Sequence, residues 1–179
     1  MKYRWSVLIS LCAFVFLPSI CGAQTYQGPS GGYGGTPFDN WKASRESTDI
    51  ASVSFVVDNS VIRCILVWYR DSSTGRNTRL VTSGSACDLA EKPGPLSFNC
   101  CPGISLDRDE YIIGIAGRYG GRIDSLRFYT SKKNSPVFGG GGGTVDFGYT
   151  APSGQKIVAF FGRAGNNLDA IGVMYGPIR

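Results

Sequence analysis

The chain contains no histidine. Without histidine it can form no Ser-His-Asp triad and offers no imidazole to a metal ion. Its cysteines never occur as Cys-x-x-Cys, the other common pattern of a zinc site. We therefore expect no metal and no cofactor.

Long apolar runs are missing beyond residues 1–23. In that leader, Lys2 and Arg4 precede a short uncharged apolar run, and small residues ending at Ala23 follow. This order is typical of a secretory signal peptide, and the run is short for a membrane anchor. We expect a secreted, extracellular protein made of one domain, residues 24–179, with no insertion into a membrane.

Dense positive charge is also missing. The chain has 18 Lys and Arg against 13 Asp and Glu, and cleavage after Ala23 would remove two of the cations. The remaining net charge, 16 − 13 = +3, is mild, and no Lys/Arg stripe appears. These features argue against nucleic acid as a partner.

Four cysteines remain after the leader, an even number that suits disulfides in an oxidising compartment. They are Cys64, Cys87, Cys100 and Cys101. Three pairings are open. Because a bond between the adjacent Cys100 and Cys101 would be strained, one of them could join Cys87 and the other Cys64. A disulfide-linked homodimer is a further alternative.

Short apolar segments separated by Gly, Pro, Asn and Ser predict an all-β domain built of hairpins. No window of ten or more residues shows the periodicity of a helix. The expected strands are Ile50–Val57, Val61–Tyr69, Tyr111–Gly117, Ile123–Thr130, Ile157–Gly162 and Leu168–Tyr175.

An internal repeat organises these strands. The segment Tyr111–Thr130 recurs in altered form as Gln155–Met174. Both copies contain an apolar strand, Gly-Arg, a turn, the pattern Gly-x-x-x-Asp and a second strand. Asp124 and Asp169 occupy matching places, so the same corner carries a carboxylate twice.

A third, weaker copy lies upstream at Ser54–Tyr69, with Arg63 at the place of the acid. The irregular segment Cys87–Ile104 that follows is interpreted as a loop pinned by disulfides. Three hairpin units of unequal fidelity imply a threefold pseudosymmetric β structure.

Glycine-rich loops accompany the hairpins. They are Gly31–Thr36, Gly139–Thr144 and a reduced version, Ser83-Gly84-Ser85. A flexible linker is the simpler interpretation. Each loop runs directly into strand-like sequence, however, which favours positive φ or close backbone approach inside a packed domain.

The segments GPSGGYGGTPFDN (28–40), FGGGGGT (138–144) and GRAGNNLDAIGVMYG (162–176) resemble the jacalin-related lectins. The resemblance covers essentially the whole chain after the leader. It implies a β-prism I fold of three four-stranded antiparallel sheets with threefold pseudosymmetry. It also implies sugar binding at one end of the prism, with glycans and glycoproteins as partners.

The resemblance implies that a sugar lies between the Gly-x-x-x-Asp loop and a glycine loop of the neighbouring unit. The carboxylate can accept bonds from two adjacent hydroxyls, and backbone amides of the turn can donate. The first site then consists of Gly34, Gly35, Asn166, Asn167, Leu168 and Asp169. The alternative is that Asp169 only caps its turn.

The repeat predicts a second site on the same principle. It consists of Gly142, Gly143, Gly121, Arg122, Ile123 and Asp124. The alternative is that Asp124 belongs to a degenerate turn kept for structure. No third site is expected, because Arg63 replaces the acid.

The sequence also bears on sugar specificity. Galactose-type relatives are cut at the glycine loop, whereas Gly35 lies within a continuous chain, and Asn166 and Asn167 offer no aromatic ring. Both points favour mannose or glucose, although Tyr33 or Tyr119 could supply a ring for galactose.

Two other function classes compete with a lectin. One is a glycoside hydrolase with Asp124 and Asp169 as acid and base, which is disfavoured because symmetry-related units place them at different sites. We expect no enzyme. The other is a structural extracellular matrix or mineral-associated protein that retains the fold.

Overall fold

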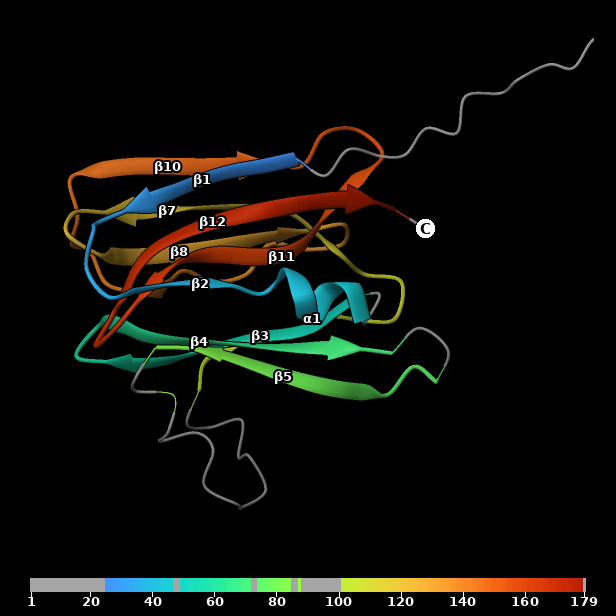
Figure 1. The fold of residues 1–179 in the computed structure, drawn as a ribbon. Helices are drawn as coiled ribbons and strands as arrows, with labels where there is room; N and C mark the ends of the chain where they lie inside the picture. Colours follow the sequence, from blue (N-terminus) through green and yellow to red (C-terminus); the bar gives the residue numbers. More distant parts are fainter. Residues whose placement is uncertain (1–24, 47–48, 72–73, 85–86, 88–100, 179) are drawn as a thin grey trace, which may run out of the picture.

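The computed structural model describes residues 25–46, 49–71, 74–84, 87 and 101–178. These residues form twelve strands and one short helix. The strands make three four-stranded antiparallel sheets, which form the sides of a prism (Figure 1). The expected all-β, three-sheet architecture is confirmed.

We number the sheets I to III by the order of their central hairpins in the chain. Sheet I contains, in spatial order, β5 (Asn77–Ser83), β4 (Val61–Arg70), β3 (Asp49–Asp58) and β6 (Gly103–Ser105). Sheet II contains β10 (Val145–Thr150), β7 (Ile112–Tyr119), β8 (Ile123–Thr130) and β9 (Phe138–Gly139). Sheet III contains β1 (Thr25–Gly31), β12 (Leu168–Pro177), β11 (Gln155–Ala164) and β2 (Thr36–Asp39).

The six strands expected from the sequence are the two central strands of each sheet. The outer strands were not expected. Several of them are too short to show alternation: β9 has 2 residues, β6 has 3 and β2 has 4. Pairing with a central strand, rather than their own pattern, defines them.

Sheet III joins the two ends of the described chain. Strand β1 pairs antiparallel with β12, placing Tyr26 opposite Met174. Strand β2 pairs with the far side of β11. The loop between β1 and β2 therefore spans the β11–β12 hairpin at the end where that hairpin turns.

One aromatic side chain from each sheet meets in the core. Phe128 of sheet II packs against Phe55 of sheet I, with ring centroids 5.8 Å apart. It also packs edge-on against Phe160 of sheet III at 6.1 Å. All three side chains are fully buried, and burial of such rings is a main source of core stability.

The helix α1 (Trp41–Glu46) was not expected. Its first turn is capped by Asp39, whose Oδ1 accepts a 2.7 Å hydrogen bond from the Trp41 backbone N–H. Ala43 is buried within it and belongs to the main core cluster. With 6 residues the helix is too short to give a periodic signal in the sequence.

The structure decides among the open disulfide pairings. Cys64 of β4 bonds Cys87, with Cα atoms 5.5 Å apart, so the suggestion that Cys87 joins Cys100 or Cys101 is wrong. Adjacent strands bring the two together, because β5 pairs with β4 and the chain reaches Cys87 soon after β5 ends. Cys101 packs against the bonded pair, and Cys100 lies outside the described residues.

The expected signal peptide, residues 1–23, also lies outside the described residues. Within the part of the chain that the structure describes, no helix has the length and apolar character needed to cross a membrane.

Candidate functional site

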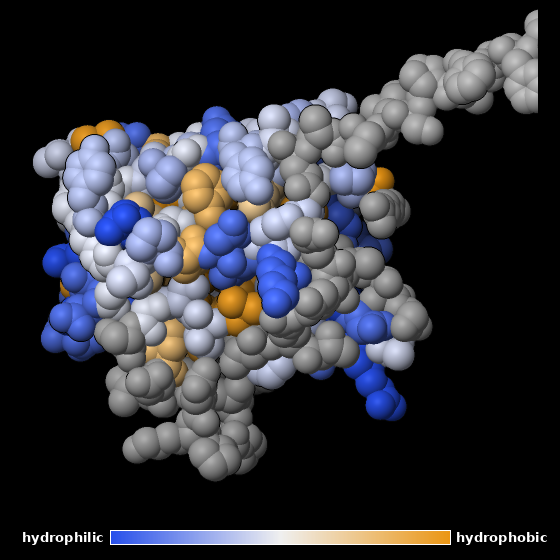
Figure 2. Space-filling view, in the orientation of Figure 1, coloured by the Kyte–Doolittle hydropathy of each residue, from blue (hydrophilic) through white to orange (hydrophobic). Residues whose placement is uncertain are grey.

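The candidate loops gather at one end of the prism, on the left in Figure 1. They are the three central hairpin turns, the β1–β2 loop and the β9–β10 loop. In Figure 2 the left edge of the molecule is mostly pale or blue, so the residues visible there are of intermediate to hydrophilic character. Such a surface suits a hydroxyl-rich ligand better than an apolar one.

The same backbone contact occurs in all three sheets. A glycine at positive φ approaches the carbonyl of the residue at the acid position so closely that an added Cβ would clash. That Cβ would lie 2.2 Å from the Asp169 oxygen at Gly31, 2.3 Å from that of Asp124 at Gly139, and 2.6 Å from that of Arg63 at Gly84. The three units, including the weak one, are therefore structurally equivalent.

The first predicted site brings Asp169 against the β1–β2 glycine loop. A Cβ added at Gly34 would lie 2.6 Å from Asp169 Oδ1, and one added at Gly35 would lie 2.6 Å from Oδ2. The Gly32 backbone N–H donates a 2.8 Å hydrogen bond to the Asp169 carbonyl. Only glycine allows the loop to come this close to both carboxylate oxygens.

Asp169 is only 7% exposed. Its Oδ2 has no hydrogen-bond partner among the described residues. Burial raises the pKa of this carboxyl above its ordinary value, and a hydrogen bond from the Gly165 N–H and the charges of Arg163 and Arg122 only partly oppose the shift. A buried acceptor without a partner is costly, which makes this oxygen a candidate acceptor for a ligand hydroxyl.

Arg163 organises this site, and sequence reasoning missed it. Its Nε donates to the carbonyls of Tyr33 at 3.1 Å and Gly34 at 2.8 Å, and its Nη2 donates to the Gly35 carbonyl at 2.7 Å. The Gly-Arg pair present in both repeats was the available signal. In the other copy of the repeat, Arg118 likewise donates to a glycine-loop carbonyl, that of Gly141, at 3.4 Å.

The second predicted site repeats the first. A Cβ added at Gly142 would lie 2.5 Å from Asp124 Oδ1, and one at Gly143 would lie 2.8 Å from Oδ2. The Gly140 N–H donates a 2.8 Å hydrogen bond to the Asp124 carbonyl. The Nε of Arg122 lies 3.7 Å from Asp124 Oδ1.

A cavity of about 450 Å³ lies over Asp124. Its described lining residues are Gly120, Gly121, Arg122, Asp124, Gly143, Thr144 and Asn167. It combines a carboxylate acceptor, a guanidinium donor and a hydroxyl, which is the kind of mixed polar set that binds sugar hydroxyls.

Our assignment of the two halves of each site to neighbouring units was wrong. Asp169 and its glycine loop both belong to sheet III, and Asp124 and its glycine loop both belong to sheet II. The reason is that each glycine loop joins the two outer strands of one sheet across the turn of its central hairpin. Asp124 and Asp169 consequently face different glycine loops.

The remaining predicted residues differ in their placement. Leu168 and Ile123 are fully buried, so only their backbone faces the turns. Asn166 is exposed in its turn. Asn167 turns toward sheet I, where its Oδ1 accepts a 2.8 Å hydrogen bond from Arg63 Nη1.

The two aromatic candidates also differ. Tyr33 is 96% exposed on the first glycine loop. Tyr119 is half-buried and packs edge-on against Phe147, with centroids 6.0 Å apart. Only Tyr33 offers a ring to a ligand.

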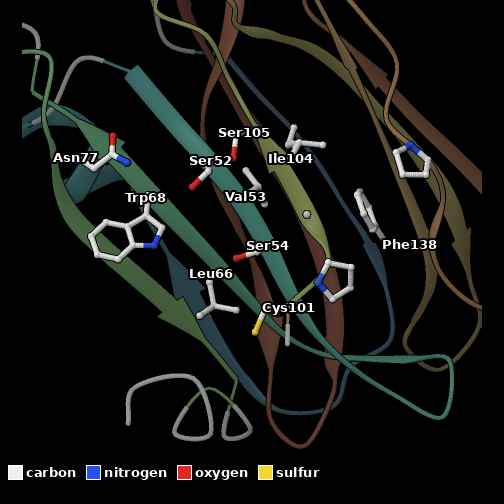
Figure 3. Close-up of a pocket in the computed structure, with 13 residues that line it drawn as sticks. Ser52, Val53, Ser54, Leu66, Trp68, Asn77, Cys101, Ile104, Ser105 and Phe138 are labelled. Carbon is white, nitrogen blue, oxygen red and sulfur yellow. The ribbon is translucent and has the colours of Figure 1, made fainter. Parts of the chain in front are cut away.

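A separate cavity of about 670 Å³ lies on the outer face of sheet I (Figure 3). Leu66 and Trp68 of β4 and three serines of β3 and β6 line it, with Ile104 and Phe138 at its other side. None of the described residues around it is charged, and none belongs to either predicted sugar site.

Comparison with known proteins agrees with this geometry. The family described as the jacalin-like lectin domain matches residues 27–174. Agglutinin from Castanea crenata is 31% identical over 156 residues, which cover 82% of this chain and 45% of that protein. Horcolin from Hordeum vulgare is 39% identical over 79 residues, covering 41% of this chain and 53% of horcolin. The chain thus spans about half the length of these relatives.

Two solved structures share the fold at 25% sequence identity. Malaysian banana lectin has a TM-score of 0.66, covering 86% of this chain and 99% of that chain. Artocarpin in complex with mannotriose has a TM-score of 0.64, covering 86% of this chain and 97% of that chain. With a family match across most of its length and the β-prism in place, the chain belongs to the jacalin-like lectin family.

Proposed function

We propose that this protein is a secreted lectin that binds mannose- or glucose-type residues of glycans at two sites per chain. The observation that carries the proposal is the repeated pairing of a carboxylate with a glycine loop, at Asp169 and at Asp124. A turn-capping role alone would explain one such acid. It would not explain why, at both acids, the two carboxylate oxygens lie directly against glycine residues of a loop.

The chemistry follows from the groups at each site. A hexose presents neighbouring hydroxyls, each of which both donates and accepts. The carboxylate of Asp169 accepts from two of them, in charge-assisted bonds that are stronger than neutral ones. Backbone N–H groups of the 165–168 turn donate to the ring oxygen or to a further hydroxyl.

Mannose or glucose is favoured over galactose on two grounds. The β1–β2 loop runs unbroken through Gly35, and no aromatic residue occupies the 165–168 turn. Relatives with the same fold include artocarpin, described as a lectin with mannose specificity, and a mannose-binding lectin from champedak. The exposed ring of Tyr33 keeps galactose as the alternative.

Each site alone should bind weakly. A single monosaccharide held by a few hydrogen bonds at a wet surface is expected to have a Kd of about 1 mM. Two sites on one rigid body, or a homodimer, could raise avidity for a glycan-covered surface by about 10²–10⁴-fold. Two weak sites therefore suit a protein whose target is a surface rather than a free sugar.

The test uses the protein secreted by a eukaryotic host, screened on a glycan array and titrated with methyl α-D-mannoside by NMR. We expect array signals for mannose- or glucose-terminated glycans and two titrating sites. Asp169→Asn and Asp124→Asn should each reduce the stoichiometry from two to one. Asp109→Asn serves as the matched control, because its carboxylate pairs with Lys132 away from both sites.

The outcomes separate the rivals. Galactose-terminated signals would replace the mannose assignment. An intact fold that is silent across the array would favour a structural extracellular role. Unchanged stoichiometry in Asp124→Asn would dispose of the second site alone.

A further inference from the structure

Arg63, which stands at the acid position of sheet I, also contacts a residue of sheet III. Its side chain is 30% exposed and is anchored by Asp58, whose Oδ2 lies 3.1 Å from Arg63 Nη2. Its Nη1 donates to Asn167 Oδ1 at 2.8 Å, across 104 residues of sequence. The residue at the acid position of sheet I is thus bonded to the sheet III hairpin that carries Asp169.

This contact fixes the orientation of the Asn167 amide. A guanidinium has only donors, so the atom that faces it must be the amide oxygen. The oxygen and nitrogen of an asparagine are otherwise hard to distinguish, and here the chemistry settles the choice. The Nδ2 group, with its two N–H donors, is consequently on the side away from Arg63.

Asn167 also lines the cavity over Asp124. The first glycine loop also contacts the β7–β8 turn, since a Cβ added at Gly32 would lie 2.0 Å from the Gly121 carbonyl oxygen. The wall of the second site is therefore completed by a residue of sheet III.

We propose that Asn167 is a ligand-binding residue of the Asp124 site and that Arg63 is its positioning residue. The Asn167 Nδ2 donates to a sugar hydroxyl whose neighbour donates to Asp124. Arg63 occupies Oδ1 and so holds the amide in the donating orientation. All three sheets then contribute to the second site, although only two of them carry an acid. This inference rests on the proposed sugar binding at Asp124.

The experiment isolates the second site in an Asp169→Asn background. Methyl α-D-mannoside is titrated into the labelled protein, and the amide signals of Gly142 and Gly143 report the Kd. Arg63→Met should weaken binding about fivefold to tenfold, the loss expected for one poorly oriented hydrogen bond. Arg63→Lys, which can still donate to Oδ1, should recover most of the affinity. Arg76→Met, at an exposed arginine in the β4–β5 turn, is the control and should leave the Kd within about twofold.

Two further variants separate positioning from general stability. Asn167→Asp keeps an acceptor for Arg63 but has no N–H donor, so affinity should fall while the melting temperature is kept or raised. In an Asn167→Ala background, Arg63→Met should have no additional effect, because a residue that acts through another is non-additive with it.

The results that would overturn the inference are specific. If the Asp169→Asn protein binds the sugar but Arg63→Met and Asn167→Asp leave its Kd within about twofold, the Arg63–Asn167 role is refuted and the second site stands. If the Asp169→Asn protein does not bind at all, the second site itself is refuted. Additive effects of Arg63→Met and Asn167→Ala would show that Arg63 does not act through Asn167.

Discussion

Arg163 holds Gly35 in place: its Nη2 lies 2.7 Å from the Gly35 carbonyl oxygen, while its Nε binds the carbonyls of Tyr33 and Gly34. A loop with glycines at positions 34 and 35 is intrinsically flexible, and ordering it costs conformational entropy. The guanidinium of Arg163 is planar and carries five donors, so this one residue of β11 can hold three loop carbonyls in fixed positions.

Replacing Arg163 should therefore impair binding more than folding. We expect Arg163→Met to weaken methyl α-D-mannoside binding at the first site about tenfold or more, because the loop must then be ordered by the ligand. The free energy of unfolding should fall by about 1–3 kcal/mol through loss of these hydrogen bonds. NMR titration and urea denaturation measure the two effects, with Arg76→Met as the control. A variant that binds as well as the wild type would show that the loop is ordered without Arg163.

Asp169→Asn should separate the ligand role from the turn-capping role. The carboxylate is buried and its Oδ2 lacks a partner among the described residues, so removing its charge should change the free energy of unfolding by less than about 1 kcal/mol. Binding at the first site should be lost. Thermal unfolding and titration on the same preparation test both. A large loss of stability would support turn capping instead.

Acidification should weaken sugar binding at the first site at a higher pH than an ordinary aspartate would imply. Since burial raises the pKa of Asp169, the folded protein takes up this proton at a higher pH than the unfolded chain does. The cost of the buried charge applies above the folded pKa and disappears once the pH falls below the ordinary value of about 4. Protonation also removes the Asp169 carboxylate as a hydrogen-bond acceptor over the same pH range.

We therefore expect the Kd at the first site to rise as the pH falls through a midpoint above about 4. Titrations between about pH 7 and pH 4, with the melting temperature recorded at each pH, would show this. Affinity that stays constant down to about pH 4 would contradict the raised pKa.

Two glycines with nearly the same backbone angle provide a matched pair for the second site. Gly143 has φ +75° and Gly154 has φ +77°. An alanine Cβ at Gly143 would lie 2.8 Å from Asp124 Oδ2, whereas one at Gly154 would meet nothing within 4 Å.

Both substitutions to alanine should cost about 1 kcal/mol in stability from the left-handed conformation. Gly143→Ala should cost more than this, because its Cβ would also lie 2.8 Å from the Tyr119 carbonyl carbon. Only Gly143→Ala should also remove binding at the Asp124 site, as counted by NMR stoichiometry. Loss of that site in Gly154→Ala would mean that backbone strain, not the close approach, is responsible.

The disulfide should matter for stability and not for sugar binding. Cys64 and Cys87 close a loop with a sequence separation of 23 on the outer face of sheet I. The Cys64→Ala, Cys87→Ala double variant should lose about 3 kcal/mol of unfolding free energy. The Kd for methyl α-D-mannoside should stay within about twofold. A folded double variant with impaired binding would show that the disulfide shapes the sites.

The central hairpins were predictable because each of their strands is long enough to alternate and each pair is local in sequence. The outer strands were not, since β6, β9 and β2 are short and are defined by pairing with a central strand. The disulfide partners were left open for a related reason. Sequence spacing does not reveal that β5 runs beside β4 and delivers Cys87 to Cys64.

The residues of the candidate sites also divide into those that the sequence identified and those that it did not. Asp169, Asp124 and the facing glycines were identifiable because repetition distinguishes a selected pattern from a chance one. Arg163 and Arg63 were not assigned their contacts, since a long side chain can reach many partners and only the packed loops decide which carbonyl or amide it meets.

By itself the sequence determined the hairpins, the repeat and the two acids, because these depend on local alternation and on matching positions along the chain. The tertiary structure decided that both halves of each site belong to one sheet. It also decided that the third unit, which has no acid, bonds to Asn167 beside the second site. These relations depend on how three sheets close into a prism, and closure brings together residues whose distance along the chain carries no information about their distance in space.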